Sequence, residues 1–273
     1  MVALPENSPF GPALAVFHDR LYCAWTGTDD QRLVNLISST DGVRFDHKLT
    51  FEARSTAGPA LAVYGGRLHL AWTGTDKEHQ LNIMSSADGT RFARDRVLSE
   101  SATGGPALAV YRDRLYCAWT GTDERHSINV MSSTDGQAFT GKRTLTERSA
   151  HRPALVAAAR PAALLLAWTG LDGHVNLLRS ADGKAFTGKA TLGEESIAEP
   201  ALGSDADGLY LAWTGIDEEH HLNVLRSDAT GRHFDHKTTY EATSPAGPAL
   251  SASADRTAHL AWNAHYRLNV TPI

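Results

Sequence analysis

Residues 59–85, PALAVYGGRLHLAWTGTDKEHQLNIMS, carry a pattern that repeats along the whole chain of 273 residues. A Pro-Ala-Leu triplet opens the stretch, an Ala-Trp pair follows, and an Asn between two apolar residues stands near its end. The triplet recurs every 47 residues, with one interval of 48, and its copies start at Pro12, Pro59, Pro106, Pro153, Pro200 and Pro248. A fixed period of this length is the signature of a repeat architecture, so it decides the fold.

The rest of the pattern repeats with the triplet. All six tryptophans of the chain belong to it, at Trp25, Trp72, Trp119, Trp168, Trp213 and Trp262. The asparagines follow at Asn35, Asn82, Asn129, Asn176, Asn223 and Asn269. Six units of about 47 residues leave no room for a second domain. We therefore expect residues 1–273 to form one domain, with units that start near residues 11, 58, 105, 152, 199 and 247.

Each unit has the pattern of four short strands. In the second unit we expect strands over residues 59–64, 67–73, 80–85 and 94–100, separated by turns at Gly65-Gly66, Gly74-Thr75-Asp76 and Asp88-Gly89. No segment shows a helical period, and a linear β-solenoid usually has a shorter repeat. Four strands per unit are typical of a propeller blade. The sequence predicts an all-β fold, a closed six-bladed β-propeller of four-stranded antiparallel blades.

The two ends of the chain indicate how the ring closes. The first residues align with the fourth strand of a unit, whereas the last unit stops at Ile273, after its third strand. We therefore expect Val2–Pro5 to supply the fourth strand of the sixth blade, which would remove the exposed edges of an open ring. On this basis we also expect the chain to be complete as it stands.

Composition indicates which classes of partner the protein can bind and where in the cell it is located. Acidic residues outnumber basic ones, 31 to 26, which argues against a nucleic-acid partner. We expect no membrane partner either, because no apolar run is long enough to cross a bilayer. The N-terminus lacks the features of a signal peptide. Cys23 and Cys117 lie in the first and third units, too far apart to pair, and we expect two buried free thiols, a cytoplasmic location and a monomer.

A second motif follows the third strand of most units. It is Ser39-Thr-Asp41-Gly42-Val-Arg-Phe45 in the first unit, and it recurs at Ser86–Phe92, Ser133–Phe139 and Ser180–Phe186, with a degenerate copy at Ser227–Phe234. This motif resembles the Asp-box of the sialidase-like (BNR-like) propellers. The resemblance implies a structural role on the face opposite the active site: the Asp accepts turn amides, the Gly takes a positive φ and the aromatic ring packs between sheets. The sialidase catalytic motifs are absent, so the resemblance implies the fold without that activity.

The loop between the second and third strands holds the candidate ligand-binding residues. They are the loop aspartates Asp29, Asp76, Asp123, Asp172 and Asp217, and the histidines His79, His126, His174 and His220. Each unit also has a Glu, at Glu6, Glu52, Glu100, Glu147, Glu194 and Glu241, on the same face. Carboxylates beside aromatic rings suit sugars. The alternative is that the Asp caps the turn and the His is merely exposed, and for the tryptophans we favour a place in the core.

Two further hypotheses concern metals and catalysis. We expect no metal site and no cofactor, because the histidines are spread one per blade and no Cys-rich motif occurs. If the protein is an enzyme, its centre should come from residues that break the symmetry: His151 and Arg152 replace an Ala-Gly pair, and Glu199 replaces a Gly.

The favoured function is a non-enzymatic, multivalent, lectin-like module that binds carbohydrate or a similar polar small ligand. Near-identical blades favour it, because repeated weak sites gain avidity. A glycosidase or lyase with one asymmetric site, or a protein–protein scaffold, remains the alternative.

Overall fold

The computed structural model describes residues 1–93, 96–159, 161–205, 208–228, 233–251 and 258–273, and within them it contains strands and no helix. The described part of the chain therefore has no helix that is long and apolar enough to span a bilayer. The first strands are β1 (Val2–Asn7), β2 (Ala13–Phe17), β3 (Arg20–Thr26), β4 (Leu33–Ser39), β5 (Phe45–Arg54), β6 (Ala60–Tyr64), β7 (Arg67–Thr73), β8 (Gln80–Ser86), β9 (Arg96–Ser101), β10 (Ala107–Tyr111), β11 (Arg114–Thr120) and β12 (Ser127–Ser133). The others are β13 (Phe139–Arg148), β14 (Ala154–Ala159), β15 (Ala162–Thr169), β16 (His174–Ser180), β17 (Thr187–Glu195), β18 (Ala201–Ser204), β19 (Leu209–Thr214), β20 (His221–Ser227), β21 (Phe234–Thr243), β22 (Ala249–Ser251), β23 (His259–Ala264) and β24 (Arg267–Pro272).

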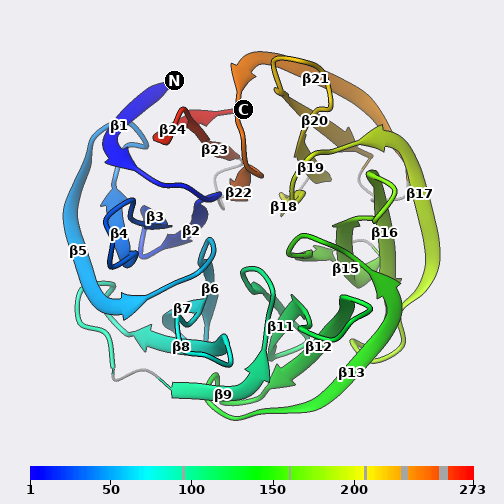
Figure 1. Ribbon diagram of the computed structural model, residues 1–273, viewed down its shortest axis with the longest axis horizontal. Helices are drawn as coiled ribbons and strands as arrows, with labels where there is room; N and C mark the ends of the chain where they lie inside the picture. Colours follow the sequence, from blue (N-terminus) through cyan, green and yellow to red (C-terminus); the bar gives the residue numbers. More distant parts are fainter. Residues whose placement is uncertain (94–95, 160, 206–207, 229–232, 252–257) are drawn as a thin grey trace.

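These strands form six four-stranded antiparallel sheets arranged as the blades of a propeller, as the sequence predicts (Figure 1). Blades 1 to 5 are β2–β5, β6–β9, β10–β13, β14–β17 and β18–β21, and blade 6 is β22–β24 together with β1. The first strand of each blade lies innermost and contacts the innermost strands of both neighbours, and β2 contacts β22, so the ring is closed.

The N-terminal strand completes the last blade, which confirms the predicted closure. β1 pairs with β24, and Val2 lies opposite Val270 in the register. Leu4 is buried in the apolar cluster between blades 6 and 1. The strand runs to Asn7, two residues beyond the predicted end, because a bulge lets Asn7 pair with Arg267.

The core consists of six apolar clusters, one between each pair of neighbouring blades. Each contains one of the repeated tryptophans, all of which are 2% exposed or less. The inner strands are buried on both faces because each blade is covered on both sides. The placement of the tryptophans in the core is confirmed.

The strand bounds of the second unit differ slightly from the prediction. Its first strand begins at Ala60, because Pro59 has no N–H to donate to the ladder, and its third runs to Ser86. Its fourth strand is described as Arg96–Ser101, and residues 94 and 95 of the predicted strand lie outside the described residues.

Four of the five boxes have the expected local geometry. In the first, Asp41 Oδ1 accepts the backbone N–H groups of Val43 and Arg44 at 2.8 and 2.7 Å, and Gly42 has a φ of +70°. The box glycine also lies against a ring of the preceding blade: a Cβ on Gly89 would overlap the Tyr22 hydroxyl. The fifth box includes residues 229–232, which lie outside the described residues.

The antiparallel blades define two faces of the ring. The loop face carries the loops between second and third strands, at residues 27–32, 74–79, 121–126, 170–173, 215–220 and 265–266, and the connections between blades. The box face carries the hairpins between first and second strands and the boxes.

Candidate functional site

The five loop aspartates lie on the loop face with exposed side chains, and each caps its own loop. Asp76 Oδ1 accepts the backbone N–H groups of Glu78 and Gln80, both at 3.1 Å. The other four accept in the same way, from Gln31 to Asp29, from Arg125 and Ser127 to Asp123, from His174 to Asp172 and from His221 to Asp217. A carboxylate has about four acceptor positions, so this capping leaves capacity for a ligand hydroxyl.

The loop histidines adopt a left-handed backbone conformation. His79, His126 and His220 have φ values of 52°, 54° and 59°. Their carbonyls accept the N–H of the segment that leads into the next blade, as from Ala102 to His79 at 3.1 Å. This bond joins the loop to the blade junction, and the rings of His79 and His126 are exposed at the rim.

His174 does not occupy the same position as the other three histidines. Counting back three residues from Asn176, the structural equivalent of His79 is Gly173, which has a φ of +85°. His174 instead opens β16, and its Nδ1 lies 3.7 Å from Glu195. The loop of blade 4 is shorter than those of blades 1, 2, 3 and 5. The sequence analysis took the first His after the loop Asp as the equivalent residue, which is wrong in blade 4, whereas alignment on Asn176 identifies Gly173.

The glutamates of the outer strands pair with lysines at four blade junctions. Lys48 Nζ lies 2.7 Å from Glu6 and 5.5 Å from the centre of the Trp25 ring. The same arrangement joins Lys142, Lys189 and Lys237 to Glu100, Glu147 and Glu194, over Trp119, Trp168 and Trp213. A lysine thus lies between each of these tryptophans and glutamates, which the sequence pattern did not reveal.

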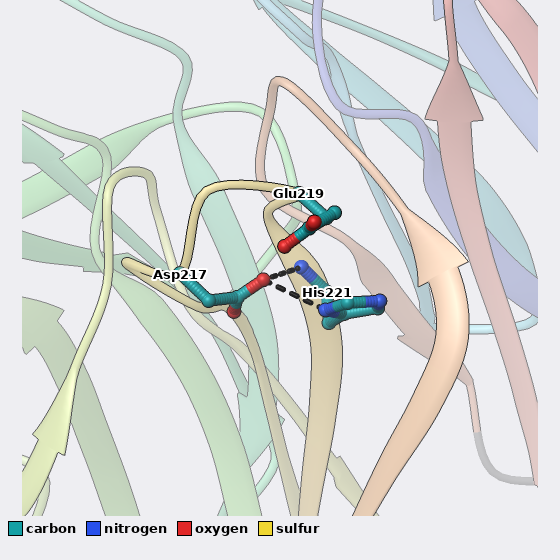
Figure 2. A group of neighbouring side chains, drawn as sticks. All are labelled: Asp217, Glu219 and His221. Carbon is teal, nitrogen blue, oxygen red and sulfur yellow. Dashed lines mark hydrogen bonds and ion pairs between the residues drawn. The ribbon is translucent and has the colours of Figure 1, made fainter.

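One loop groups three potential metal ligands. Ligand atoms of Asp217, Glu219 and His221 lie within 4.8 Å of one another in blade 5 (Figure 2). Asp217 Oδ1 accepts from His221 Nδ1 at 2.7 Å and from its backbone N–H at 3.1 Å. The backbone N–H bond and the imidazole together hold the pKa of Asp217 below its ordinary value. His220 belongs to the loop and His221 opens β20, so the two adjacent histidines do not share a strand.

Two of the three symmetry-breaking residues, Arg152 and Glu199, meet at the propeller axis on the loop face. Arg152 Nε lies 3.4 Å from Glu199 Oε1, with side chains that are 11% and 16% exposed. The Arg152 guanidinium also donates to the carbonyls of Pro59 at 2.8 Å and Pro12 at 3.2 Å. The backbone carbonyl of His151 accepts a hydrogen bond from the Thr120 hydroxyl at 2.7 Å. The structure therefore brings Arg152 and Glu199 together, with the guanidinium engaged by the backbone.

Beneath Arg152 the axial channel is lined mainly by apolar side chains. A cavity of about 90 Å³ is lined by the six Pro-Ala-Leu triplets, and a deeper one of about 360 Å³ by leucine, alanine and valine side chains together with Ser204 and Ser251. Among the described lining residues of these two cavities there is no acidic or basic side chain that could act together with Glu199 and Arg152.

Of the cavities described on the loop face, the largest is a cleft between blades 6 and 1. It has a volume of about 470 Å³ and is lined by Asn7, Arg32, His265, Tyr266 and the loop at residues 27–28. It exists because the loop of blade 6 has three residues fewer between its second-strand Asn263 and Asn269 than blade 5 has between Thr214 and Asn223.

Neither Asn7 nor Arg32 was singled out by the sequence analysis. Asn7 ends β1, and Arg32 takes the position that His79 has in blade 2, with a φ of 50°. The Arg32 guanidinium lies 5.9 Å from the centre of the Phe10 ring, which holds it beside the cleft. The shortened loop was a visible signal for this cleft, because it removes the wall that the other loops provide.

Comparisons with known proteins agree with the fold. No protein-family model matches this chain, and no curated protein matches it in sequence. A protein of unknown function from Dyadobacter fermentans superposes with a TM-score of 0.76 at 12% identity over 98% of this chain and 95% of its own. The SapL1 lectin in complex with alpha methyl fucoside gives 0.66 at 12% identity, over 94% and 89%.

An enzyme shares the architecture as well. A GH43 endo-arabinanase from Bacillus licheniformis gives a TM-score of 0.53 at 13% identity, over 81% of this chain and 94% of its own. Because all these identities are low, the comparisons show a propeller fold that is similar to those of a lectin and a glycosidase.

Proposed function

We propose that this protein is a non-enzymatic, lectin-like propeller that binds carbohydrate, or a polar small molecule of similar shape, on its loop face. The cleft between blades 6 and 1 carries the proposal. Its volume of about 470 Å³ falls in the range of small-molecule sites. Tyr266 is 58% exposed there, an unusual exposure for a large aromatic side chain.

The chemistry of the cleft suits a sugar. The C–H face of a pyranose stacks on an aromatic ring such as that of Tyr266, while hydroxyls accept from the Arg32 guanidinium and pair with the Asn7 amide. The lining residues that the structure describes include no carboxylate. Glycoside hydrolysis normally needs two carboxyl groups beside the scissile bond, so the composition of the cleft favours binding over catalysis.

The repeated loops support further, weaker sites. The side chains of Asp76 and His79 are exposed next to a blade junction, and Asp123 with His126 repeats them one blade later. We assign the loop aspartates and histidines to these sites, with the capped carboxylates accepting ligand hydroxyls on their free lone pairs. Repetition around the ring raises avidity for a ligand that presents several sugars.

The alternative is an enzyme centred on His151, Arg152 and Glu199, and the contacts of Arg152 speak against it. Its guanidinium is committed to two backbone carbonyls and to Glu199. The SapL1 lectin supports the binding proposal by showing that a ring of this shape holds a fucoside. We further propose that the protein acts as a monomer in the cytoplasm, which light scattering and cell fractionation test.

The decisive experiment is a glycan array followed by calorimetric titration of the sugar that binds. We expect Tyr266→Ala to weaken binding at the main site by about threefold to tenfold, the usual worth of one stacked ring. Leu171→Ala is the matched control, because Leu171 is an apolar side chain of similar exposure on the loop of blade 4. Binding that survives Tyr266→Ala unchanged, or an array without a single ligand, would overturn the proposal.

A further inference from the structure

A second cavity lies on the opposite face of the ring, at the junction of blades 3 and 4. Its volume is about 390 Å³. Arg112 and Arg114 enter it from the hairpin that begins β11, and Arg143 enters from β13. Lys184 and Asp182 come from the box of blade 4, and the buried Tyr116 forms part of the wall.

The charge of this cavity is unbalanced. Four cationic side chains line it against the single carboxylate of Asp182. Asp182 Oδ1 already accepts the N–H groups of Lys184 and Ala185, both at 2.8 Å, and these bonds lower its pKa to about 2. Among the described residues, none of the four cations forms an ion pair with a carboxylate.

The arginines are held in place by other contacts. Arg114 Nε donates to Ser132 Oγ at 3.0 Å, and the guanidinium of Arg112 lies 5.4 Å from the centre of the Tyr111 ring. These contacts orient the two side chains and leave their remaining N–H groups without a protein carboxylate among the described residues. A preorganised guanidinium with unused donors is well suited to an oxyanion.

The corresponding junction of blades 1 and 2 shows what is special here. Arg20 occupies the position of Arg114, and it forms an ion pair with Asp46. In blade 3 the register replaces Asp46 by Thr140, so the partner is lost.

Three further exchanges add positive charge at the blade 3–4 junction. Leu49 is replaced by Arg143 in the register of the fourth strand. By sequence alignment, His18 is replaced by Arg112 and Thr90 by Lys184. The same backbone thus holds a neutralised arginine at one junction and a cluster of cations at another.

We propose that the cavity at the blade 3–4 junction binds an oxyanion, the sulfate or carboxylate group of a saccharide, at a site separate from the loop-face cleft. Guanidinium groups bind such anions through paired N–H donors. Like charges that line one cavity repel one another, and a bound anion offsets this repulsion. The volume accommodates one sugar ring with its charged group. The saccharide rests on the proposed function, whereas the oxyanion rests on these side chains alone.

The test is calorimetric titration of the full chain in low-salt chloride buffer with four probes: N-acetylglucosamine 6-sulfate, glucuronic acid, N-acetylglucosamine and inorganic sulfate. We expect the charged sugars to bind and the uncharged sugar not to bind at this site. Affinity should fall as sodium chloride is added, since salt screens the attraction. Tighter binding of the sugar sulfate than of inorganic sulfate identifies a saccharide as the source, and equal binding identifies the free oxyanion.

Variants locate the site. Arg114→Gln combined with Arg143→Gln should weaken binding of the charged probe by about tenfold or more, because two charge-assisted donors are lost. Arg20→Gln, at the equivalent position in blade 1, is the matched control and should leave the affinity unchanged. If the double variant does not fold, by its melting temperature, Lys184→Gln replaces it and should weaken binding severalfold.

Failure of this proposal is separable from failure of the loop-face proposal. Tyr266→Ala should leave the binding of inorganic sulfate unchanged, because that probe has no sugar ring to stack in the loop-face cleft. No binding of any anionic probe, equal binding of charged and uncharged sugars, or full affinity in the double variant would overturn the oxyanion site. None of these results would count against the loop-face cleft.

Discussion

Arg152 and Glu199 form an ion pair at the axis, at positions where the other four blades have glycine. In those blades the glycine backbone touches the preceding blade closely: a Cβ on Gly58 would overlap the carbonyl oxygen of Gly11. Blades 4 and 5 have side chains at these positions instead, and the Arg152 guanidinium bonds across the axis to the carbonyls of Pro12 and Pro59. One side chain thereby joins blades 1, 2, 4 and 5.

The ion pair should therefore be a stability device. Arg152→Met should lower the free energy of unfolding by about 3–5 kcal/mol, because it leaves the Glu199 charge buried without its partner. The double variant Arg152→Gly, Glu199→Gly restores the residues of the other blades and should cost less than Arg152→Met alone. Denaturant unfolding of Arg152→Gly, of Glu199→Gly and of the double variant measures the coupling. Additive losses would show that the two side chains act independently.

Closure by β1 should dominate the stability of blade 6. Deleting residues 1–8 removes the partner of β24, and we expect a sharp loss of stability with oligomers that form through the open edge. Leu4→Ala is the milder change and should cost about 2–4 kcal/mol, since Leu4 is almost fully buried. Calorimetry and light scattering provide the readouts, with the exposed Ala3→Ser as the control. A truncated protein that melts like the full chain would refute this role.

The boxes should give the protein a defined acid response. The N–H bonds of Ala138 and Gln137 lower the pKa of Asp135 to about 2, against about 3.9 in an unfolded chain. A lowered pKa stabilises the fold above the unfolded value, and this stabilisation is lost as the pH falls through the folded value. Asp135→Asn should therefore lower the melting temperature at pH 5 to 7, and its difference from the wild type should shrink between about pH 4 and pH 2.

The two thiols should be inert in the folded protein. Burial, followed by the nearby charges of Glu6 and Glu100, raises the pKa of Cys23 and of Cys117 to about 12. Thiolate is the reactive form, so a disulfide reagent at pH 8 should label neither residue until the protein unfolds, and then both. Rapid labelling of the native protein would show that the inter-blade cores open on that timescale.

Ligand stoichiometry separates repeated sites from a single site. We expect more than one ligand per chain, and Asp76→Ala with His79→Ala should remove a fraction of the sites while the other blades keep theirs. An enzyme centre would instead bind one ligand and lose it with Arg152→Ala. Calorimetric titration reports both the number of sites and their affinities. A single site per chain, abolished by Arg152→Ala and unaffected by Asp76→Ala, would contradict multivalent binding.

The sequence predicted the features that the repeat itself determines. Each Trp follows its Pro-Ala-Leu triplet in the same strand order, 13 to 15 residues after the Pro, so its place between blades follows from the packing of one blade on the next. The repeat also predicted that β1 would complete the last blade, because the first residues align with a fourth strand and the last unit stops after its third. Local turn chemistry was equally readable, because the box hydrogen bonds span only two or three residues.

Features that depend on distant contacts were not predictable. The hydrogen bond from Arg152 to the Pro12 carbonyl joins residues 140 positions apart, and the sequence around neither residue predicts it. The lysines over the tryptophans escaped notice because each ion pair crosses a blade junction, as from Lys48 to Glu6. The volume of the cleft beside Tyr266 depends on how far a shortened loop withdraws, which composition alone does not determine.

The shared sheet of β1 and β24 has a topological consequence for engineering. Since both ends of the described chain lie in one blade, where a sixth box would otherwise stand, a loop with the sequence of residues 40–47 can join Ile273 to Met1 (Figure 1). New termini can then be opened at the box of any other blade, because each box connects the same pair of strands. Such circular permutants would move the seam around the ring while every inter-blade core stayed the same, so the cost of a seam could be compared blade by blade.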